Sequence, residues 1–252
     1  MKELDGKSAL VTGCSGAIGR AIAFKLASQG SNIAIHYHKN LKSAQSLSSS
    51  LKEKFGIGTM LISSDLREAS EVNAMVDQVI GRWPNIDILV NNAGTASDQY
   101  LTLMTEERWD NIIDINLTGA FHCLKAVIPH MIRAGTGKIV NMSSTTGICG
   151  MRARTNYGAS KGALIGLTRS LAREFGPDRI YVNALTPGMI EGGLSEDLSS
   201  GQRKLHEAIT PLSRFGRPED VADAVFFLCS SLSDHITGEV ITISGGEVTW
   251  YF

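Results

Sequence analysis

The sequence predicts one α/β domain: a doubly wound parallel sheet of seven strands with helices on both faces. Short β-rich runs alternate with longer amphipathic runs along the whole chain. Most of the short runs are continuously apolar, which is typical of strands buried on both faces of a sheet. The length of 252 residues fits a single large domain, and no linker rich in Pro or Ser divides it.

Each expected element follows from this pattern. The predicted strands are Ser8–Thr12, Asn32–Tyr37, Thr59–Ile62, Ile86–Val90, Lys138–Met142, Ile180–Ala184 and Val240–Ile243. The predicted helices are Gly16–Gln29, Leu41–Phe55, Glu68–Arg82, Glu106–Arg133, Tyr157–Phe175 and Pro218–Ser230. The stretch Gly188–Arg217 contains no strand and follows directly on a strand, so we expect a lid over a ligand site there.

Composition excludes several classes of protein. Apolar residues make up 43% of the chain and charged residues 19%, which excludes wholesale disorder. Lys and Arg number 24 and Asp and Glu 25, so no global positive field exists for nucleic acid or an anionic membrane. No apolar run reaches about 18 residues, and we expect a cytoplasmic protein without a membrane span. The four cysteines form no CxxC pair, and we expect no metal site.

A glycine-rich turn follows the first predicted strand. Gly13, Gly16 and Gly19 lead into a helix, where free main-chain amides and the helix dipole favour a pyrophosphate. A plain tight turn is the alternative. The second strand ends in Tyr37, His38 and Lys39 without the acid that usually binds the ribose 2′-hydroxyl of NAD. The basic residues favour NADP(H) over NAD(H), and a solvated basic turn is the alternative.

Tyr157 and Lys161 share one face of a predicted helix at the spacing i, i+4. An ammonium group favours the phenolate form and lowers the pKa of a neighbouring tyrosine. Such a pair can exchange a proton with a carbonyl or alcohol oxygen. Ser143 or Ser144, at the end of the preceding strand, can hydrogen-bond the same oxygen. A surface pair on the helix is the alternative.

Together these motifs resemble the short-chain dehydrogenase/reductase family over essentially the full length. Further matches are Asp65, the run Asn91-Asn92-Ala93-Gly94, Asn116, and the turn Pro187-Gly188. The resemblance implies a Rossmann fold and a catalytic set of Asn116, Ser144, Tyr157 and Lys161. It implies cofactor contacts from Gly13, Ser15, Gly16, Ile18, Gly19, Tyr37, His38, Lys39, Asp65, Leu66, Asn92, Ala93, Gly94, Tyr157, Lys161, Pro187, Gly188 and Ile190.

The resemblance also implies a mechanism of hydride transfer between a nicotinamide and the substrate carbon. Tyr157 is then the general acid in reduction and the base in oxidation, and Ser144 orients the carbonyl oxygen. Lys161 binds the nicotinamide ribose and lowers the pKa of Tyr157. Asn116 binds a water that links Lys161 to solvent.

Three positions depart from the family pattern. Ala17 stands where the family usually has Gly, and Gly16 stands where many NADP-preferring members have a basic residue. Gly192 stands where the family often has a Thr that touches the nicotinamide carboxamide. The main-chain amide of Ile190 can still bind that carboxamide.

The segments INLTGAF and GRPEDVADAVFFL most resemble 3-oxoacyl-ACP reductases. We therefore expect an NADPH-dependent reductase of a 3-oxoacyl group or a related ketone. The alternatives are an NAD-linked dehydrogenase of a sugar or polyol and a dinucleotide-sensing module without turnover. An acyl carrier protein would meet a positive rim of Arg133, Lys138, Arg173 and Arg179, or these residues are ordinary surface charge.

Further expectations concern assembly and substrate. Small residues along Tyr157–Phe175 fit a subunit interface or packing on the chain's own sheet, and the usual state of the family predicts a homotetramer. The apolar chain end Gly245–Phe252 predicts either a subunit contact or a wall of the substrate pocket. Arg152 or Arg154 would contact an anionic substrate.

Overall fold

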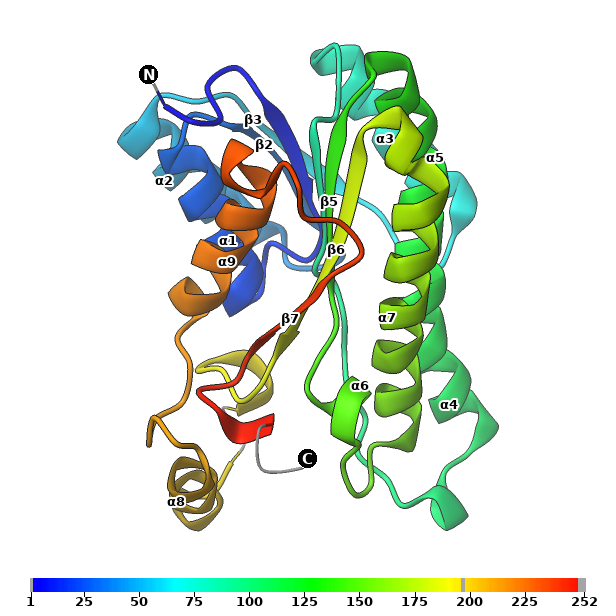
Figure 1. Cartoon of the computed structure of the whole chain (residues 1–252), viewed down its shortest axis with the longest axis vertical. Helices are drawn as coiled ribbons and strands as arrows, with labels where there is room; N and C mark the ends of the chain where they lie inside the picture. The colour runs from blue at the N-terminus through cyan, green and yellow to red at the C-terminus, as the bar shows by residue number, and fades with distance from the viewer. Residues whose placement is uncertain (1, 196–197, 249–252) are drawn as a thin grey trace.

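A computed structural model describes residues 2–195 and 198–248, and it has one sheet of seven parallel strands (Figure 1). The order across the sheet is β3-β2-β1-β4-β5-β6-β7, and every neighbouring pair is parallel. The predicted fold class is therefore confirmed. The strands are β1 (Ser8–Val11), β2 (Asn32–Tyr37), β3 (Thr59–Ser63), β4 (Ile88–Asn91), β5 (Gly137–Met142), β6 (Ile180–Pro187) and β7 (Val240–Ile243).

Helices cover both faces of the sheet. Figure 1 shows α1, α2 and α9 on one face and α3, α5 and α7 on the other. A separate cluster of buried apolar side chains lies under each layer. The helices are α1 (Ala17–Ser28), α2 (Leu41–Phe55), α3 (Ala69–Arg82), α4 (Glu106–Ile113), α5 (Gly119–Ala134), α6 (Thr146–Cys149), α7 (Thr155–Phe175), α8 (Ser200–Ile209) and α9 (Pro218–Cys229).

The strand order reverses between β1 and β4, and the loops that follow these strands diverge from there. In an open α/β sheet a crevice forms at such a point, outside the carboxyl ends of the strands. The Thr12 hydroxyl joins the two loops by accepting hydrogen bonds from the main-chain amides of Asn92 and Ala93, both at 2.9 Å. The Asn92 side chain donates to the Thr12 carbonyl at 2.8 Å. These hydrogen bonds therefore hold the loops after β1 and β4 together at the base of the crevice.

The predicted helix Glu106–Arg133 is interrupted. Between α4 and α5 the chain makes a π-helical turn over Asp114–Thr118. Such a turn inserts one residue and rotates the side chains that follow it, and it is frequent at functional sites. The run Glu106–Ala134 is long and apolar enough to cross a membrane by length and composition, and its buried side packs on α3 and the sheet.

The stretch Gly188–Arg217 has more structure than the sequence analysis expected. It contains a short 3₁₀ helix, Gly193–Ser195, and α8, which begins with a capping box of Ser199 and Gln202. Ile190 pairs with Gly216 in an isolated parallel bridge, so the two ends of the stretch lie side by side. Its role as a lid remains a prediction.

Replacing Gly19 with Ala tests the close packing at the first turn. A Cβ atom at Gly19 would lie 2.4 Å from the Gly13 carbonyl oxygen and 2.7 Å from Nδ2 of Asn92. We expect Gly19→Ala to lower the free energy of unfolding by about 2 kcal/mol or more, because main chain must move. Chemical denaturation measures this loss.

Gly81→Ala is the matched control. Gly81 is exposed on α3, and a Cβ atom there meets nothing within 4 Å. This substitution should raise stability by up to about 1 kcal/mol, because alanine favours helix over glycine. Equal effects of the two substitutions would contradict the packing argument.

Candidate active site

A cavity of about 490 Å³ opens at the carboxyl ends of the strands beside the β1/β4 reversal. Most of the predicted site residues line it. They are Gly13, Ser15, Gly16, Ile18, Gly19, His38, Asn92, Ala93, Gly94, Ser144, Tyr157, Lys161, Pro187, Gly188 and Ile190. Tyr37, Lys39, Asp65, Leu66 and Asn116 are not part of its lining. Among residues 2–195 and 198–248, no cluster of three His, Cys, Asp or Glu side chains can hold a metal ion.

The N-terminus of α1 opens into this cavity without a cap. Gly16 is the N-cap residue, no side chain caps the helix, and its first turn carries no acidic residue. Free amides and the positive end of the helix dipole therefore face the cavity. Ala17 is the first helical residue and does not have a positive φ, so the departure from Gly causes no backbone strain there. Gly13, with φ +68°, is the residue that needs glycine.

His36 is a cavity residue that the sequence analysis missed as a functional position. Its Nδ1 atom accepts a hydrogen bond from the amide of Gly13 at 3.1 Å, so the proton is on Nε2, which donates to the Ser64 carbonyl at 3.0 Å. Burial lowers the pKa of His36 to about 4. The neutral ring therefore anchors the glycine-rich turn to β2 and β3. The available sequence signal was that His36 is a polar residue one position before the end of a predicted buried strand, close to where ligands bind in such sheets.

The basic turn after β2 is only partly directed at the cavity. His38 lines the cavity, whereas Lys39 is exposed outside it and Tyr37 packs against the apolar core. The predicted direct contacts of Tyr37 and Lys39 therefore have no support from this geometry. The side chain of Tyr37 is drawn into the core because its ring is largely apolar.

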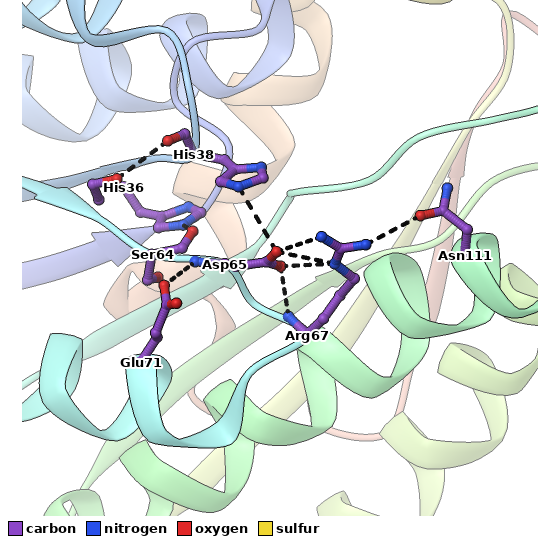
Figure 2. A network of polar contacts seen from close by, with 8 residues as sticks. His36, His38, Ser64, Asp65, Arg67, Glu71 and Asn111 are labelled. Atoms are coloured by element: carbon purple, nitrogen blue, oxygen red, sulfur yellow. Dashed lines mark hydrogen bonds and ion pairs between the residues drawn. The ribbon is translucent and has the colours of Figure 1, made fainter.

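A polar network surrounds Asp65 at the edge of the cavity. Figure 2 shows its carboxylate between His38 and Arg67. Nε of Arg67 lies 3.0 Å from both carboxylate oxygens, and Nε2 of His38 lies 3.8 Å from one of them. The hydrogen bonds from Arg67 hold the pKa of Asp65 at about 2. Arg67 therefore offsets the negative charge that Asp65 would otherwise present beside His38. The neighbouring Leu66 is buried in the core.

Gly94 lies directly against the side chains of Lys161 and Asn116, two of the predicted catalytic residues. A Cβ atom at this position would lie 3.1 Å from Nζ of Lys161 and 3.2 Å from Oδ1 of Asn116. Both side chains therefore occupy space that any other residue at position 94 would need.

The Lys161 ammonium is almost fully buried, and it donates a hydrogen bond to the carbonyl of Met142 at 2.7 Å. Burial lowers the pKa of Lys161 to about 8, because the charged form is poorly solvated. The Nζ atom lies 5.7 Å from the centre of the Tyr157 ring. A cation is thus held one helical turn from the phenol.

Tyr157 and Ser144 face the cavity together. Burial raises the pKa of Tyr157, and a hydrogen bond with Ser144 and the charge of Arg154 lower it in part. The net direction is opposite to the expected lowering by Lys161, because loss of solvation outweighs the nearby charges. Tyr157 is therefore protonated at neutral pH. The hydroxyl of the neighbouring Ser143 donates to the main-chain carbonyl of Lys161 at 2.7 Å, which leaves Ser144 as the serine directed at Tyr157.

Asn116 lies in the π-helical turn and is buried. Its Oδ1 atom accepts from the amide of Thr95 at 2.8 Å, and its Nδ2 atom donates to the Thr95 carbonyl and to Ser160 Oγ. The side chain is thus used to fix the loop after β4 to α7. A water relay through Asn116 remains a prediction.

The opposite wall follows β6. Pro187, Gly188, Ile190 and Gly192 all line the cavity. Glu247, from the turn after β7, joins them, and the sequence analysis did not single it out. The expectation that the chain end forms a pocket wall therefore holds for this residue, whereas 249–252 lie outside the described residues.

The two candidate arginines have partners. Arg154 lines the cavity, and its Nε atom binds both carboxylate oxygens of Asp98 at 2.8 and 2.9 Å. The exposed Arg152 lies over the ring of Tyr100. The amide of Gln99 donates to the carbonyl of Ala153 at 2.7 Å. These contacts hold the loop after β4 against the loop before α7 at the mouth of the cavity.

The expected positive rim lies at the end of the sheet opposite the cavity. Lys138 is the second residue of β5, Arg179 directly precedes β6, and Arg133 and Arg173 lie in the last turns of α5 and α7. These positions are at the amino ends of the strands, whereas the cavity is at the carboxyl ends. Lys138 is also paired with Asp234 at 2.8 Å. A carrier protein bound to this rim would be a strand length away from the catalytic groups.

Comparisons with known proteins agree with this geometry. A family model described as enoyl-(acyl carrier protein) reductase matches residues 13–247. The 3-oxoacyl-[acyl-carrier-protein] reductase FabG of Staphylococcus aureus (strain Mu50) is 41% identical over 240 residues, which cover 95% of this chain and 97% of the relative. The protein of the same name from Aquifex aeolicus is 39% identical over 244 residues, covering 97% and 98%.

Solved structures are also similar over nearly the whole chain. A putative short-chain alcohol dehydrogenase from Sinorhizobium meliloti 1021 has a TM-score of 0.94 at 32% identity and covers 98% of both chains. A gluconate 5-dehydrogenase from Burkholderia cenocepacia J2315, in complex with NADP and tartrate, has a TM-score of 0.93 at 31% identity. The alignment covers 98% of this chain and 97% of that one.

The pKa of Lys161 predicts a pH dependence of stability. The unfolded chain binds its proton up to a pKa of about 10.5, whereas the folded chain releases it near 8. Between these values the unfolded state binds more protons, so this residue's contribution to the free energy of unfolding rises with pH. The rise should reach about 3 kcal/mol at most.

Denaturation of wild type and Lys161→Met between pH 7 and 10.5 measures this difference, over a window set by the two pKa values. Repeating the Lys161→Met comparison in a protein that also carries Tyr157→Phe excludes any contribution from titration of the Tyr157 phenol. A stability difference that stays constant over this range would contradict the burial of a charged lysine.

Proposed function

Because the chain belongs to the short-chain dehydrogenase/reductase family, we propose that it is an NADPH-dependent reductase of 3-oxoacyl thioesters or related ketones. One observation carries the proposal: Ser144, Tyr157 and Lys161 meet in a cavity that also contains the uncapped N-terminus of α1. The first group of residues suits a carbonyl oxygen and the helix end suits a pyrophosphate. The relatives named 3-oxoacyl-[acyl-carrier-protein] reductase support the substrate class.

The cavity fits a nicotinamide dinucleotide. Gly13 and Gly94 line it without side chains of their own, and the amides of the first turn of α1 are directed into it. His38 would meet a 2′-phosphate, and Arg67 reduces the repulsion from Asp65. When bound, the reduced cofactor supplies the hydride.

The chain's own groups supply the proton and its orientation. Tyr157 is protonated and buried, so its hydroxyl can donate a proton to a substrate oxygen as negative charge develops there. The Ser144 hydroxyl donates a hydrogen bond to the same oxygen and holds it in place. The buried Lys161 ammonium stabilises the phenolate that the transfer leaves behind.

A dehydrogenase of a sugar acid or polyol is the second candidate. Two solved structures similar to this chain are described as gluconate dehydrogenases, one of them putative. The carboxyl of Glu247 and the guanidinium of Arg154 also give the cavity polar walls. The same catalytic groups serve this reaction in the opposite direction, with Tyr157 as the base.

The assembly proposal is a homotetramer, supported by exposed apolar side chains on neighbouring helices. Trp109 is exposed on α4, and Phe121 and Ile132 on α5. Exposed aromatic and aliphatic side chains are typical of protein–protein contacts. The cytoplasmic location remains a prediction.

Tyr157→Phe tests the proposed function directly. Removal of the phenolic hydroxyl should lower kcat by about 10³-fold, because the proton donor is lost. The Kd of NADPH should change by less than about threefold, since the ring and its packing remain. NADPH consumption with an acetoacetyl thioester of N-acetylcysteamine gives kcat, and calorimetry gives Kd. Wild type that binds NADPH and reduces no ketone would instead support a sensing module.

His38→Ala tests the basis of cofactor preference, with Lys39→Ala as the matched control. His38 lines the cavity and Lys39 does not. His38→Ala should weaken NADPH binding about tenfold and leave NADH binding nearly unchanged, because only NADPH carries the extra phosphate. Lys39→Ala should weaken NADPH binding less than about threefold. Calorimetry with both cofactors at fixed salt decides the point, and a larger loss in Lys39→Ala would assign the contact to the exposed lysine.

A further inference from the structure

Glu247 is placed in the cavity by a tightly packed turn. Gly245 and Gly246 follow β7 with φ of +62° and +94°, and Cβ atoms there would lie 2.8 Å from Thr210 and 2.7 Å from Pro211. The turn therefore packs closely under the segment that follows α8. It brings Oε2 of Glu247 over Gly188, where a Cβ atom would lie 2.9 Å from it. The carboxyl is thus at the end of the cavity that holds the Pro187-Gly188 turn.

The catalytic residues border the same end of the cavity. Ser144, Tyr157 and Glu247 all line it. The amide of Thr145, the residue after Ser144, donates to the carbonyl of Pro187 at 3.0 Å. The segment that carries Ser144 therefore adjoins the Pro187-Gly188 turn over which Glu247 lies. Burial raises the pKa of Cys149 at the end of α6, and the charge of Glu247 raises it further.

The carboxyl of Glu247 is half-buried, and within the described part of the chain no hydrogen bond or ion pair of its oxygens is found. Arg154, the cation on the cavity wall, is bound to Asp98. Burial raises the pKa of Glu247, and His206 on α8 lowers it in part. A carboxyl that lines the cavity without such a partner is available to accept a hydrogen bond from a ligand.

We propose that Glu247 is a specificity-determining residue that hydrogen-bonds a hydroxyl group of the substrate and disfavours a substrate carboxylate at the same place. This inference rests on the proposed reductase function. A hydroxyl can donate to the carboxyl, whereas an alkyl group leaves it unpaired and a carboxylate is repelled by it. A site that pairs a buried polar group with substrate rejects analogues that lack the partner.

Three ketones of nearly equal size test the proposal. They are 2-pentanone, 4-hydroxy-2-butanone and acetoacetate, which place a methyl, a hydroxyl and a carboxylate at the end of the same short chain. The measured quantity is kcat/KM with NADPH for wild type, Glu247→Gln, Glu247→Leu and Glu239→Gln. The last variant removes a carboxylate at an exposed position outside the cavity, just before β7, and is the charge-matched control.

Wild type and Glu239→Gln should prefer the hydroxyketone over 2-pentanone by about tenfold or more. Glu247→Leu should abolish this preference, because leucine has no polar atom. Glu247→Gln should keep it and should raise kcat/KM for acetoacetate about tenfold, because the amide is polar and neutral. Thermal unfolding and the Kd of NADPH show that the variants are folded and bind the cofactor.

Two results would overturn the inference, and they are distinguishable. Ketone preferences that are the same in all four proteins, with reduction of the acetoacetyl thioester intact, would remove the role of Glu247 and leave the proposed function standing. Absence of reduction of every ketone and of the thioester by wild type that binds NADPH would overturn the proposed function and this inference together.

Discussion

The Thr12 hydroxyl links the two strands at which the sheet order reverses, and the site depends on this link. This hydroxyl accepts hydrogen bonds from the main-chain amides of Asn92 and Ala93, and these bonds hold the loop after β4 against the turn after β1. At this separation a side chain cannot be accommodated at Gly19, where a Cβ atom would lie 2.7 Å from Nδ2 of Asn92. Two residues after Asn92, a Cβ atom at Gly94 would lie 3.1 Å from Nζ of Lys161. The loop that Thr12 holds therefore lies directly against the ammonium group on α7.

Burial is the main influence on the protonation states of Tyr157 and Lys161, the proposed catalytic pair. It raises the pKa of Tyr157 and lowers that of Lys161 to about 8, so both groups are pushed toward their neutral forms. At neutral pH the phenol keeps its proton and most of the ammonium keeps its charge. A proton donor and a cation therefore coexist on two buried side chains of one site. A solvent-exposed pair could keep the same protonation states, but its charge would interact far more weakly with a reacting oxygen.

The regular elements were predictable because their apolar patterns are local, as the unchanged bounds of Asn32–Tyr37 and Leu41–Phe55 show. The π-helical turn at Asn116 was not, because it depends on partners from the loop after β4 and from α7. The proposed catalytic residues were predictable because they belong to a recurrent motif. His36 and Glu247 belong to no such motif, and only the folded chain brings them to the cavity. The side chain of Tyr37 turned inward for an equally non-local reason, the packing of the core.

Every strand of the sheet runs in the same direction, so one end of the sheet carries all the amino ends of the strands and the other end carries all the carboxyl ends. The cavity lies at the carboxyl ends of the strands. The described residues that lead into β1 lie at the opposite end of the sheet (Figure 1). We therefore expect that changes at the amino ends of the strands, where Lys138 and Arg179 lie, leave the residues of the cavity unaltered. An affinity handle, a fusion partner or a solid support attached at the start of the chain would leave the mouth of the cavity open to substrate.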